Sequence, residues 1–319
     1  MALLNVLYQF DENYAPYAGV SMTTLFENSK DIEELTVYLA TEKVSEENTK
    51  KLAQLAQSYG RTLVYLDTSM IYDRIKKVGV NSWNGSLATW MKMFVMGSVP
   101  DCVDQLLYID SDTLIPGSLR ELAELDLGDA PVAAVIDSSS RTSRERLHMK
   151  TPYCNAGVIY FNLKYWRAHD TERKMLEHLQ KHVAEYPVND QDLLNDFFRD
   201  QIYILPLRFN FQGMHFFYKD SVYFPVFGWE KGMYYTPEQI EAARRNTGII
   251  HFFRFCGEYP WEEENIHACR GLYEQALEKS LWAGHRCPKK KLAPVYRVEK
   301  ILYRVLPQKL FLKILLAVK

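Results

Sequence analysis

Short apolar runs alternate with amphipathic stretches along most of the chain. Runs with the length of buried strands occur at residues 3–8, 35–39, 62–66, 106–109 and 131–135. Stretches with helical periodicity occur at residues 17–28 and 45–59, and the second begins at a suitable N-cap, Ser45, and ends at Gly60. Because strands and helices alternate, the pattern predicts an α/β fold with a mixed, mainly parallel sheet.

The second half of the chain continues this pattern less regularly. It predicts helices within residues 81–97 and 170–185, and strands at residues 158–163, 202–206 and 248–252. Residues 138–151 are polar and basic, and we expect a loop there. The composition changes at Cys287, which is followed by proline and three lysines. We therefore expect one domain at residues 1–286 and a distinct tail at residues 287–319.

The tail is basic and amphipathic. Residues 286–319 contain ten Lys or Arg and one Glu, a net charge of +9, so the rest of the chain carries −11 of the total of −2. Apolar pairs from Ile301 to Val318 recur at helical spacing, with a kink expected at Pro307. Such a helix can pack on the acidic body or lie on an anionic membrane surface. The excess of positive charge favours the membrane.

Composition narrows the class of protein. The chain is 47% hydrophobic and 24% charged, which is typical of a globular protein with a sizeable core. Its five cysteines are odd in number and include no Cys-x-x-Cys, which favours free thiols in a reducing compartment. Residues 1–14 lack the features of a signal peptide, and no apolar stretch is long enough to span a bilayer. We expect a cytoplasmic protein, peripheral on the inner face of the cell membrane.

The stretch QLLYIDSDTLIPGSL, residues 105–119, combines a predicted strand with two carboxylates. Asp110 and Asp112 flank Ser111 where the strand ends, and open α/β sheets bind ligands at such ends. Both carboxylates can converge there on one hard divalent cation. An isolated Asp-x-Asp can equally be a solvated turn. The apolar residues on both sides favour the cation here.

Other segments carry polar residues with two interpretations each. Tyr14, in the loop after the first strand, can stack on a base or anchor a surface loop. The Asn155-Ala156-Gly157 sequence allows backbone to approach a ligand or forms a tight turn. Asp190 can act in chemistry or belong to the first turn of a helix. His251, beside an apolar run, can be a ligand or a hydrogen-bonded core residue.

These segments and their order along the chain resemble those of the family 8 retaining glycosyltransferases, the glycogenin-like group with a GT-A fold. The likeness is nearest to bacterial lipopolysaccharide and capsule galactosyl- or glucosyltransferases. It covers roughly residues 1–265. The matching segments are residues 11–15, 107–114, 155–158, 189–195, 208–211 and 250–251.

The resemblance implies roles for individual residues. Asp110, Asp112 and His251 would bind Mn²⁺ or Mg²⁺. The residues implied to hold the UDP-sugar, some of them also metal ligands, are Asp11, Asn13, Tyr14, Lys92, Asp110, Ser111, Asp112, Asp137, Asn155, Ala156, Asp190, Gln191 and Gly257. Among these, Tyr14 would stack on uracil, Asp137 would lie near the sugar or the acceptor, and Gly257 would offer backbone near the diphosphate.

The chain departs from the family pattern at three places. Lys92 replaces an arginine, so a planar bidentate donor becomes a point charge. Asn84 aligns with a histidine of the lipopolysaccharide enzymes. The segment after His251 is two residues longer than usual, and Tyr259 replaces a lysine that normally meets the diphosphate. Arg254 is the candidate to substitute for that lysine.

The resemblance implies transfer of galactose or glucose from a UDP-hexose to a hydroxyl of a lipid-linked or cell-surface glycan, with retention of configuration. Asp190 and Gln191 are the catalytic candidates. Because an amide is a poor nucleophile, we favour front-face attack with Gln191 stabilising positive charge on the sugar. Nucleic acid is not an expected partner. A nucleotidyltransferase is disfavoured by the missing Gly-rich basic loop, and an inactive nucleotide-sugar-binding scaffold is the remaining alternative.

Overall fold

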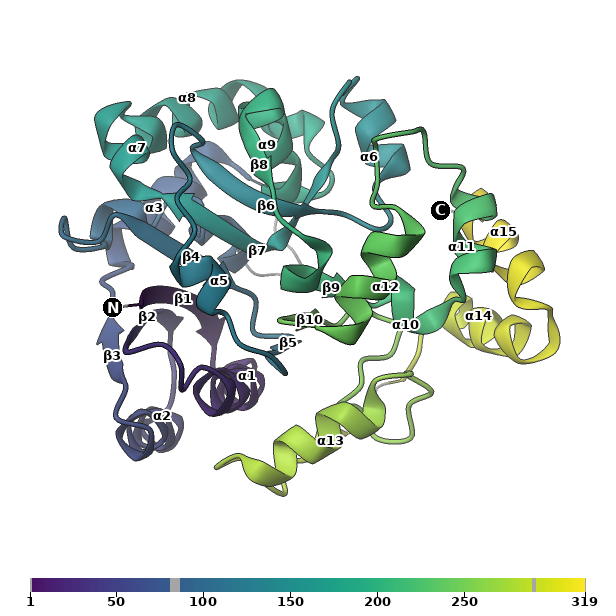
Figure 1. Cartoon of the computed structure of the whole chain (residues 1–319), viewed down its shortest axis with the longest axis horizontal. Coiled ribbons are helices and arrows are strands. Elements are labelled where there is room, and N and C mark those ends of the chain that lie inside the picture. The colour runs from purple at the N-terminus through teal and green to yellow at the C-terminus, as the bar shows by residue number, and fades with distance from the viewer. Residues whose placement is uncertain (1, 81–86, 289–290, 319) are drawn as a thin grey trace.

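The structure is a computed structural model that describes residues 2–80, 87–288 and 291–318. A mixed seven-stranded sheet, in the order β3-β2-β1-β4-β7-β6-β8, forms its centre (Figure 1). Its strands are β1 (Leu3–Asp11), β2 (Glu34–Glu42), β3 (Thr62–Tyr65), β4 (Gln105–Ile109), β6 (Val132–Ile136), β7 (Cys154–Asn162) and β8 (Ile202–Ile204). Four of the six pairings are parallel, and β7 runs antiparallel to both neighbours. The predicted mixed, mainly parallel sheet is confirmed.

Helices cover both faces of this sheet. Alternate side chains of β1 point to opposite faces. Leu4, Val6 and Tyr8 pack in a cluster with α1 (Ala15–Asn28) and α2 (Glu46–Ser58), whereas Leu7 packs in a second cluster on the other face. The helices that contribute to the second cluster are α3 (Ser69–Val78), α4 (Ala88–Met91), α7 (Leu163–Ala168), α8 (Thr171–His182) and α9 (Asn189–Phe198).

A small second sheet lies beside the central one and carries the predicted histidine. It is composed of β5 (Thr113–Leu114), β10 (Ile250–His251) and β9 (Phe211–Gln212), in that order. Further helices are α5 (Arg120–Ala123), α10 (Met214–Phe217), α11 (Asp220–Phe227), α12 (Pro237–Arg245) and α13 (Arg270–Lys279), with short 3-10 turns at Met96–Ser98, Val183–Glu185, Arg199–Gln201 and Leu207–Asn210. Pairing with β5 brings His251 opposite Thr113, next to the Asp-Ser-Asp segment.

Local predictions differ from the structure at two places. Residues 138–151, expected as a loop, contain the helix α6 (Arg141–Arg146), in which Arg141 pairs with Glu145 one turn later and Arg144 pairs with Glu230. Within residues 81–97, the described part forms only the short α4 and the start of a 3-10 turn. Asn84 lies outside the described residues.

The tail forms two helices, α14 (Pro294–Val305) and α15 (Gln308–Val318), that break at Leu306-Pro307 where a proline was expected to kink one helix. α15 packs on α11, at the right of Figure 1. Phe311 and Leu312 are buried in the same cluster as β1. No described helix is long and apolar enough to cross a membrane. All five cysteines are free thiols, as expected.

Candidate active site

A cavity of about 610 Å³ opens where β1 and β4 end at the same edge of the central sheet. The carboxyl ends of parallel strands are the usual ligand site of open α/β sheets. Most residues predicted from the sequence line this cavity: Asp11, Asn13, Tyr14, Lys92, Asp110, Ser111, Asp112, Asn155, Ala156, Asp190, Gln191 and His251. The fold thus gathers segments far apart in the sequence around one space.

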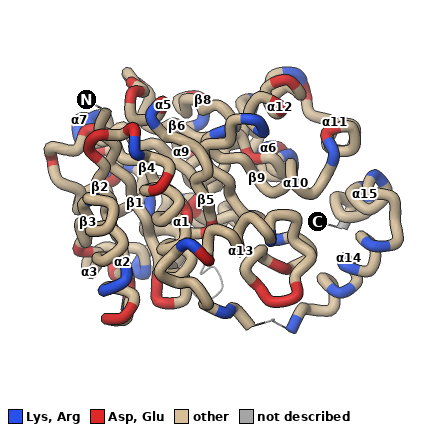
Figure 2. The backbone as a smooth tube through the Cα atoms, turned by 60° about the horizontal axis from the view of Figure 1, so that its bottom comes forward, with Lys and Arg blue, Asp and Glu red and all other residues tan. Residues whose placement is uncertain are grey.

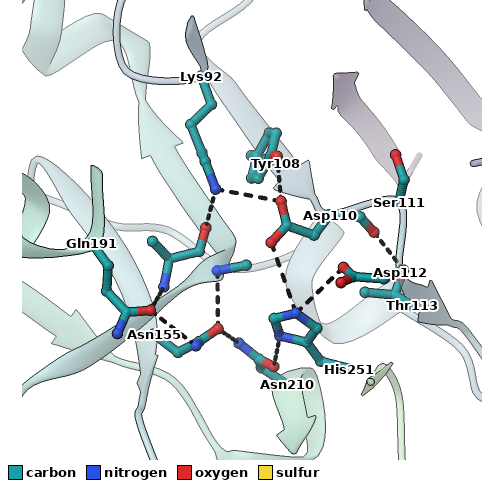
Figure 3. A network of polar contacts seen from close by, with 12 residues as sticks. Lys92, Tyr108, Asp110, Ser111, Asp112, Thr113, Asn155, Gln191, Asn210 and His251 are labelled. Carbon is teal, nitrogen blue, oxygen red and sulfur yellow. Dashed lines mark hydrogen bonds and ion pairs between the residues drawn. The ribbon is translucent and has the colours of Figure 1, made fainter. Parts of the chain in front are cut away.

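Asp110, Asp112 and His251 form a candidate metal centre. One ligand atom from each lies within 4.8 Å of the others. His251 Nε2 is 3.8 Å from Asp110 Oδ2 and 3.5 Å from Asp112 Oδ1 (Figure 3). Burial lowers the pKa of His251, but the neighbouring carboxylates outweigh burial and raise it. The two oxygens and one nitrogen suit a divalent cation such as Mn²⁺.

Asn210 fixes the orientation of the His251 ring. Its Nδ2 donates to Asn155 Oδ1 at 2.8 Å, which leaves its Oδ1 as an acceptor 3.2 Å from His251 Nδ1. His251 therefore donates from Nδ1 to Asn210, and Nε2, the ring nitrogen near both carboxylates, is the atom available to a cation. Hydrogen bonding of this kind selects the ligating tautomer in metal sites. The donor set consequently fits a bound cation.

Lys92 supplies a buried positive charge on the other side of Asp110. Its Nζ lies 3.3 Å from Asp110 Oδ1, 3.0 Å from Asp190 Oδ2 and 3.0 Å from the carbonyl of Ala156. Tyr108 also donates a hydrogen bond to Asp110 Oδ1. Burial raises the pKa of Asp190, although Lys92 acts in the opposite direction. Lys92 thus links a metal-binding carboxylate to the carboxylate at the start of α9.

Gln191 and Asn155 belong to one hydrogen-bond network with Asp137. Gln191 Oε1 accepts hydrogen bonds of 3.0 Å from both Asn155 Nδ2 and the backbone N–H of Ala156. Asp137 Oδ2 accepts from Asn155 Nδ2 at 2.9 Å and from Gln191 Nε2 at 3.3 Å. Because each of these side-chain amides has hydrogen-bond partners that fix its orientation, the network holds Gln191 in one position in the cavity wall.

The loop after β1 presents an aromatic ring at the cavity. Asp11 Oδ1 accepts from the backbone N–H of Tyr14 at 3.1 Å, and Asn13 Nδ2 donates to Asp11 Oδ2 at 3.4 Å. Burial and the charge of Asp112 raise the pKa of Tyr14 to about 12, while Arg254 lowers it. Tyr14 lines the cavity together with the metal-binding carboxylates and the cation Arg254.

Comparison with known proteins agrees with this geometry. The model of the family described as "Glycosyl transferase family 8" matches residues 5–265, which is most of the chain and includes all of the cavity residues above.

The chain belongs to glycosyl transferase family 8.

Several proteins are similar to this family 8 member along most of their length. The lipopolysaccharide 1,2-glucosyltransferase of Escherichia coli is 28% identical over 97% of this chain and 87% of its own. The lipopolysaccharide 1,3-galactosyltransferase of Salmonella typhimurium is 27% identical, with 88% and 79% covered, and general stress protein A of Bacillus subtilis is 25% identical, with 88% and 95% covered. The solved structure of galactosyltransferase LgtC with donor and acceptor sugar analogs has a TM-score of 0.69 at 22% identity, covering 92% of this chain and 99% of that one, which confirms the GT-A-type fold.

Two predicted donor residues of this glycosyltransferase do not line the cavity. Asp137 lies behind the wall and reaches the cavity through Asn155 and Gln191. Gly257 is not among the residues that line the cavity, and a Cβ at this position would meet the ring of Tyr296 in α14. Arg254 and Tyr259, both in the segment after His251 that departs from the family pattern, do line the cavity.

The sequence did not indicate the roles of Tyr108 and Asn210, which hold other site residues in position. Tyr108 is an ordinary strand residue in the pattern, and its hydroxyl reaches Asp110 because residues two apart share a face of the strand. The contact of Asn210 with His251 crosses 41 residues of sequence. A signal for Asn210 existed, since it lies in one of the matching segments, but no local pattern indicated its partner.

Proposed function

We propose that this family 8 glycosyltransferase moves galactose or glucose from a UDP-hexose to a hydroxyl group, with retention of configuration and with Mn²⁺ or Mg²⁺. The observation that carries the proposal is the convergence of Asp110, Asp112 and His251 beside Tyr14 in one cavity. That arrangement offers a cation site next to an aromatic ring suited to stacking on a base. The names of the similar lipopolysaccharide galactosyl- and glucosyltransferases support the choice of donor and of a glycan acceptor.

The cavity residues fall into three groups, which would bind the nucleotide, the metal ion and the donor sugar. Asp11, Asn13 and Tyr14 would hold the uridine at the end of β1. A divalent cation held by Asp110, Asp112 and His251 would supply Lewis-acid stabilisation of the departing UDP. The donor sugar would then lie against the wall formed by Gln191 and the network of Asn155.

The contacts of α9 favour front-face attack over a covalent intermediate. The carboxylate of Asp190 is paired with the buried Lys92, which reduces its nucleophilicity and orients it. Asp192 is fully buried and accepts hydrogen bonds from Arg146, Tyr153 and the backbone of Val188, so it cannot reach a sugar in the cavity. Gln191, an amide, is left to face the sugar and to stabilise developing positive charge.

We further propose that the acceptor is a lipid-linked glycan and that α14 holds the enzyme at the inner membrane face. Val298, Ile301 and Val305 project from one side of α14 and are 53%, 60% and 68% exposed. Lysines and arginines lie along α14 and α15 (Figure 2). An exposed aliphatic face flanked by cations is suited to an anionic membrane surface.

The experiment is a release assay for UDP with UDP-glucose or UDP-galactose, Mn²⁺ and a lipooligosaccharide acceptor. We expect release with one or both donors, loss of release in EDTA, and an α-linked product from the α-linked donor by NMR. UDP binding without release would instead favour the inactive scaffold. Release of pyrophosphate from UTP and a sugar phosphate would indicate nucleotidyl transfer.

A further inference from the structure

The segment after β10 folds back on itself as a tight hairpin, residues 254–259, which we name the Arg254 hairpin. Phe255 and Glu258 exchange two backbone hydrogen bonds, of 2.8 Å and 3.0 Å. Between them, Cys256 and Gly257 have φ values of 49° and 80°. Two successive residues with positive φ form a type I′ turn, for which glycine is suited.

This hairpin brings Arg254 and Tyr259 together at the cavity. Both residues line it, and the guanidinium lies 5.0 Å from the centroid of the Tyr259 ring. The Tyr259 ring stacks in turn on Trp261 at 4.4 Å. Within the described part of the chain, no carboxylate lies within ion-pair distance of Arg254. The guanidinium is thus an anchored cation near Tyr14 whose charge is not neutralised by a protein carboxylate.

The position of Arg254 fits the path of a diphosphate. A nucleotide stacked on Tyr14 and bound to a cation at Asp110 and Asp112 must pass its phosphates between these groups. Arg254 lines the same cavity as Tyr14, Asp110 and Asp112, so the guanidinium shares the space through which these phosphates would pass. Arginine pairs well with phosphate oxygens because its donors form a planar fork.

The helix α14 supports the hairpin from behind through an ion pair. Lys300 Nζ donates to Glu258 Oε1 at 2.6 Å, and Glu258 is only 2% exposed. The second carboxylate oxygen of Glu258 accepts from the backbone N–H of Ile266 at 3.1 Å. A carboxylate buried this deeply needs its cationic partner, because without it the charge would be uncompensated.

Two aromatic contacts from the same face of α14 complete the support. The ring of Tyr296 lies so close to Gly257 that a Cβ at that position would be 2.5 Å from its Cγ. The ring of Tyr303 meets the ring of Phe255 edge on, with centroids 4.7 Å apart. Tyr296, Lys300 and Tyr303 are spaced four and three residues apart, so one helix face holds the hairpin.

We propose that Arg254 binds the diphosphate of the donor and that α14 positions it, with Lys300 as the key positioning residue. The inference rests on the proposed function, since it requires a nucleoside diphosphate donor. It makes α14 a part of the donor site: one face supports the Arg254 hairpin, and the opposite face carries the exposed Val298, Ile301 and Val305.

The test is a double-mutant cycle of Arg254→Ala and Lys300→Ala in the full chain, with UDP and uridine affinities measured by calorimetry in Mn²⁺. Arg254→Ala should weaken UDP binding about tenfold and leave uridine binding unchanged. Lys300→Ala should also weaken UDP binding, and the double variant should bind UDP no more weakly than Arg254→Ala alone. Lys300→Arg, which keeps the charge, should restore binding.

The matched control is Arg304→Ala, which removes the same charge from an exposed position of the same helix and should bind UDP normally. Additive losses in the double variant, or normal UDP binding by either single variant, would overturn the inference while leaving the proposed function intact. Absence of UDP binding by the unmodified protein would overturn both. If Lys300→Ala fails to fold, Glu258→Gln enters the cycle with the same expected result.

Discussion

At the scale of the residue, Gly157 makes the candidate metal centre possible. A Cβ at this position would lie 2.1 Å from His251 Cε1 and 2.9 Å from Asp110 Oδ2, so any side chain would displace both groups. The backbone of Gly157 also accepts a hydrogen bond from the N–H of Asp110 at 2.8 Å. Close approach of ligand groups, rather than an unusual backbone angle, is why glycine is needed here.

Gly157→Ala should therefore weaken Mn²⁺ binding by about tenfold or more, since ligands displaced by even a fraction of an ångström lose their geometry. Calorimetric titration with Mn²⁺ measures the effect. Gly271→Ala is the control, because no atom lies within 4 Å of a Cβ placed there in α13. Equal Mn²⁺ affinity of the two variants would mean that His251 and Asp110 do not both hold the cation.

Lys92 gives a second prediction at this scale. The Lys92→Ala substitution leaves the carboxylates of Asp110 and Asp190 without the ammonium group that pairs with both. Loss of a buried ionic partner costs roughly 3–5 kcal/mol. Because Asp110 is partly exposed, we expect Lys92→Ala to lower the free energy of unfolding by about 3 kcal/mol. Saturating Mn²⁺ should stabilise Lys92→Ala more than it stabilises the unmodified protein.

Denaturant unfolding of both proteins, with Mn²⁺ and with EDTA, provides the four free energies needed. Equal stabilisation of the two proteins by Mn²⁺ would mean that the metal ion and the Lys92 ammonium do not both interact with the carboxylate of Asp110. Lys92→Arg is the matched control, because it keeps the charge and should unfold close to the unmodified protein.

Individual residues were predictable where a local pattern carried them. Asp110 and Asp112 were indicated by the strand that precedes them, and His251 by the order of the matching segments. The roles of Asn210 and Tyr108 were not, because each depends on the side chain it meets after folding. Lys92 was recognised as a departure from the family pattern. Its pairing with Asp190 has no local signal, because the two residues are almost a hundred positions apart in the sequence.

At the scale of the element, α14 has two different faces. Tyr296, Lys300 and Tyr303 contact the Arg254 hairpin, whereas Val298, Ile301 and Val305 lie on the opposite side and are exposed. The hydrophobic pattern predicted one amphipathic helix with a kink at Pro307, where the structure has a break between α14 and α15. The pattern did not show which face of the helix contacts the body of the protein. A lysine between two tyrosines is typical of an exposed helix surface, and the contact of Lys300 with Glu258 is known only from the structure.

The exposed face gives a prediction for the element. The full-length protein should sediment with vesicles that contain anionic phospholipid and should dissociate at high salt. Changing Val298, Ile301 and Val305 together to Ser should reduce the sedimented fraction several-fold, because burial of aliphatic side chains in the interface is lost. Far-UV circular dichroism would check that α14 is retained.

The control for this change removes exposed apolar side chains elsewhere, at Met70 in α3 and Leu272 in α13, which are 76% and 44% exposed. Met70→Ser with Leu272→Ser should sediment like the unmodified protein. Unchanged sedimentation of the α14 variant would contradict the membrane proposal and would leave the contact of α14 with the hairpin unaffected.

At the scale of the whole molecule, the topology brings the site together. β1 and β4 are adjacent and parallel, so the loop with Tyr14 and the Asp-Ser-Asp segment leave the same edge of the sheet. The small sheet adds His251 by pairing β10 with β5. Alternation of strands and helices predicted the class of fold. The strand order and the antiparallel β7 arise from pairings between distant segments, which periodicity does not encode.

The central claim is that Asp110, Asp112 and His251 hold a divalent cation through which UDP is bound. Calorimetric titration of UDP into the unmodified protein, with Mn²⁺ and then with EDTA, tests it most directly, and Asp112→Asn supplies the matched variant. We expect UDP to bind about 100-fold more tightly with Mn²⁺ than with EDTA, and Asp112→Asn to lose most of that difference. Equal UDP affinity in Mn²⁺ and EDTA for the unmodified protein would contradict the claim.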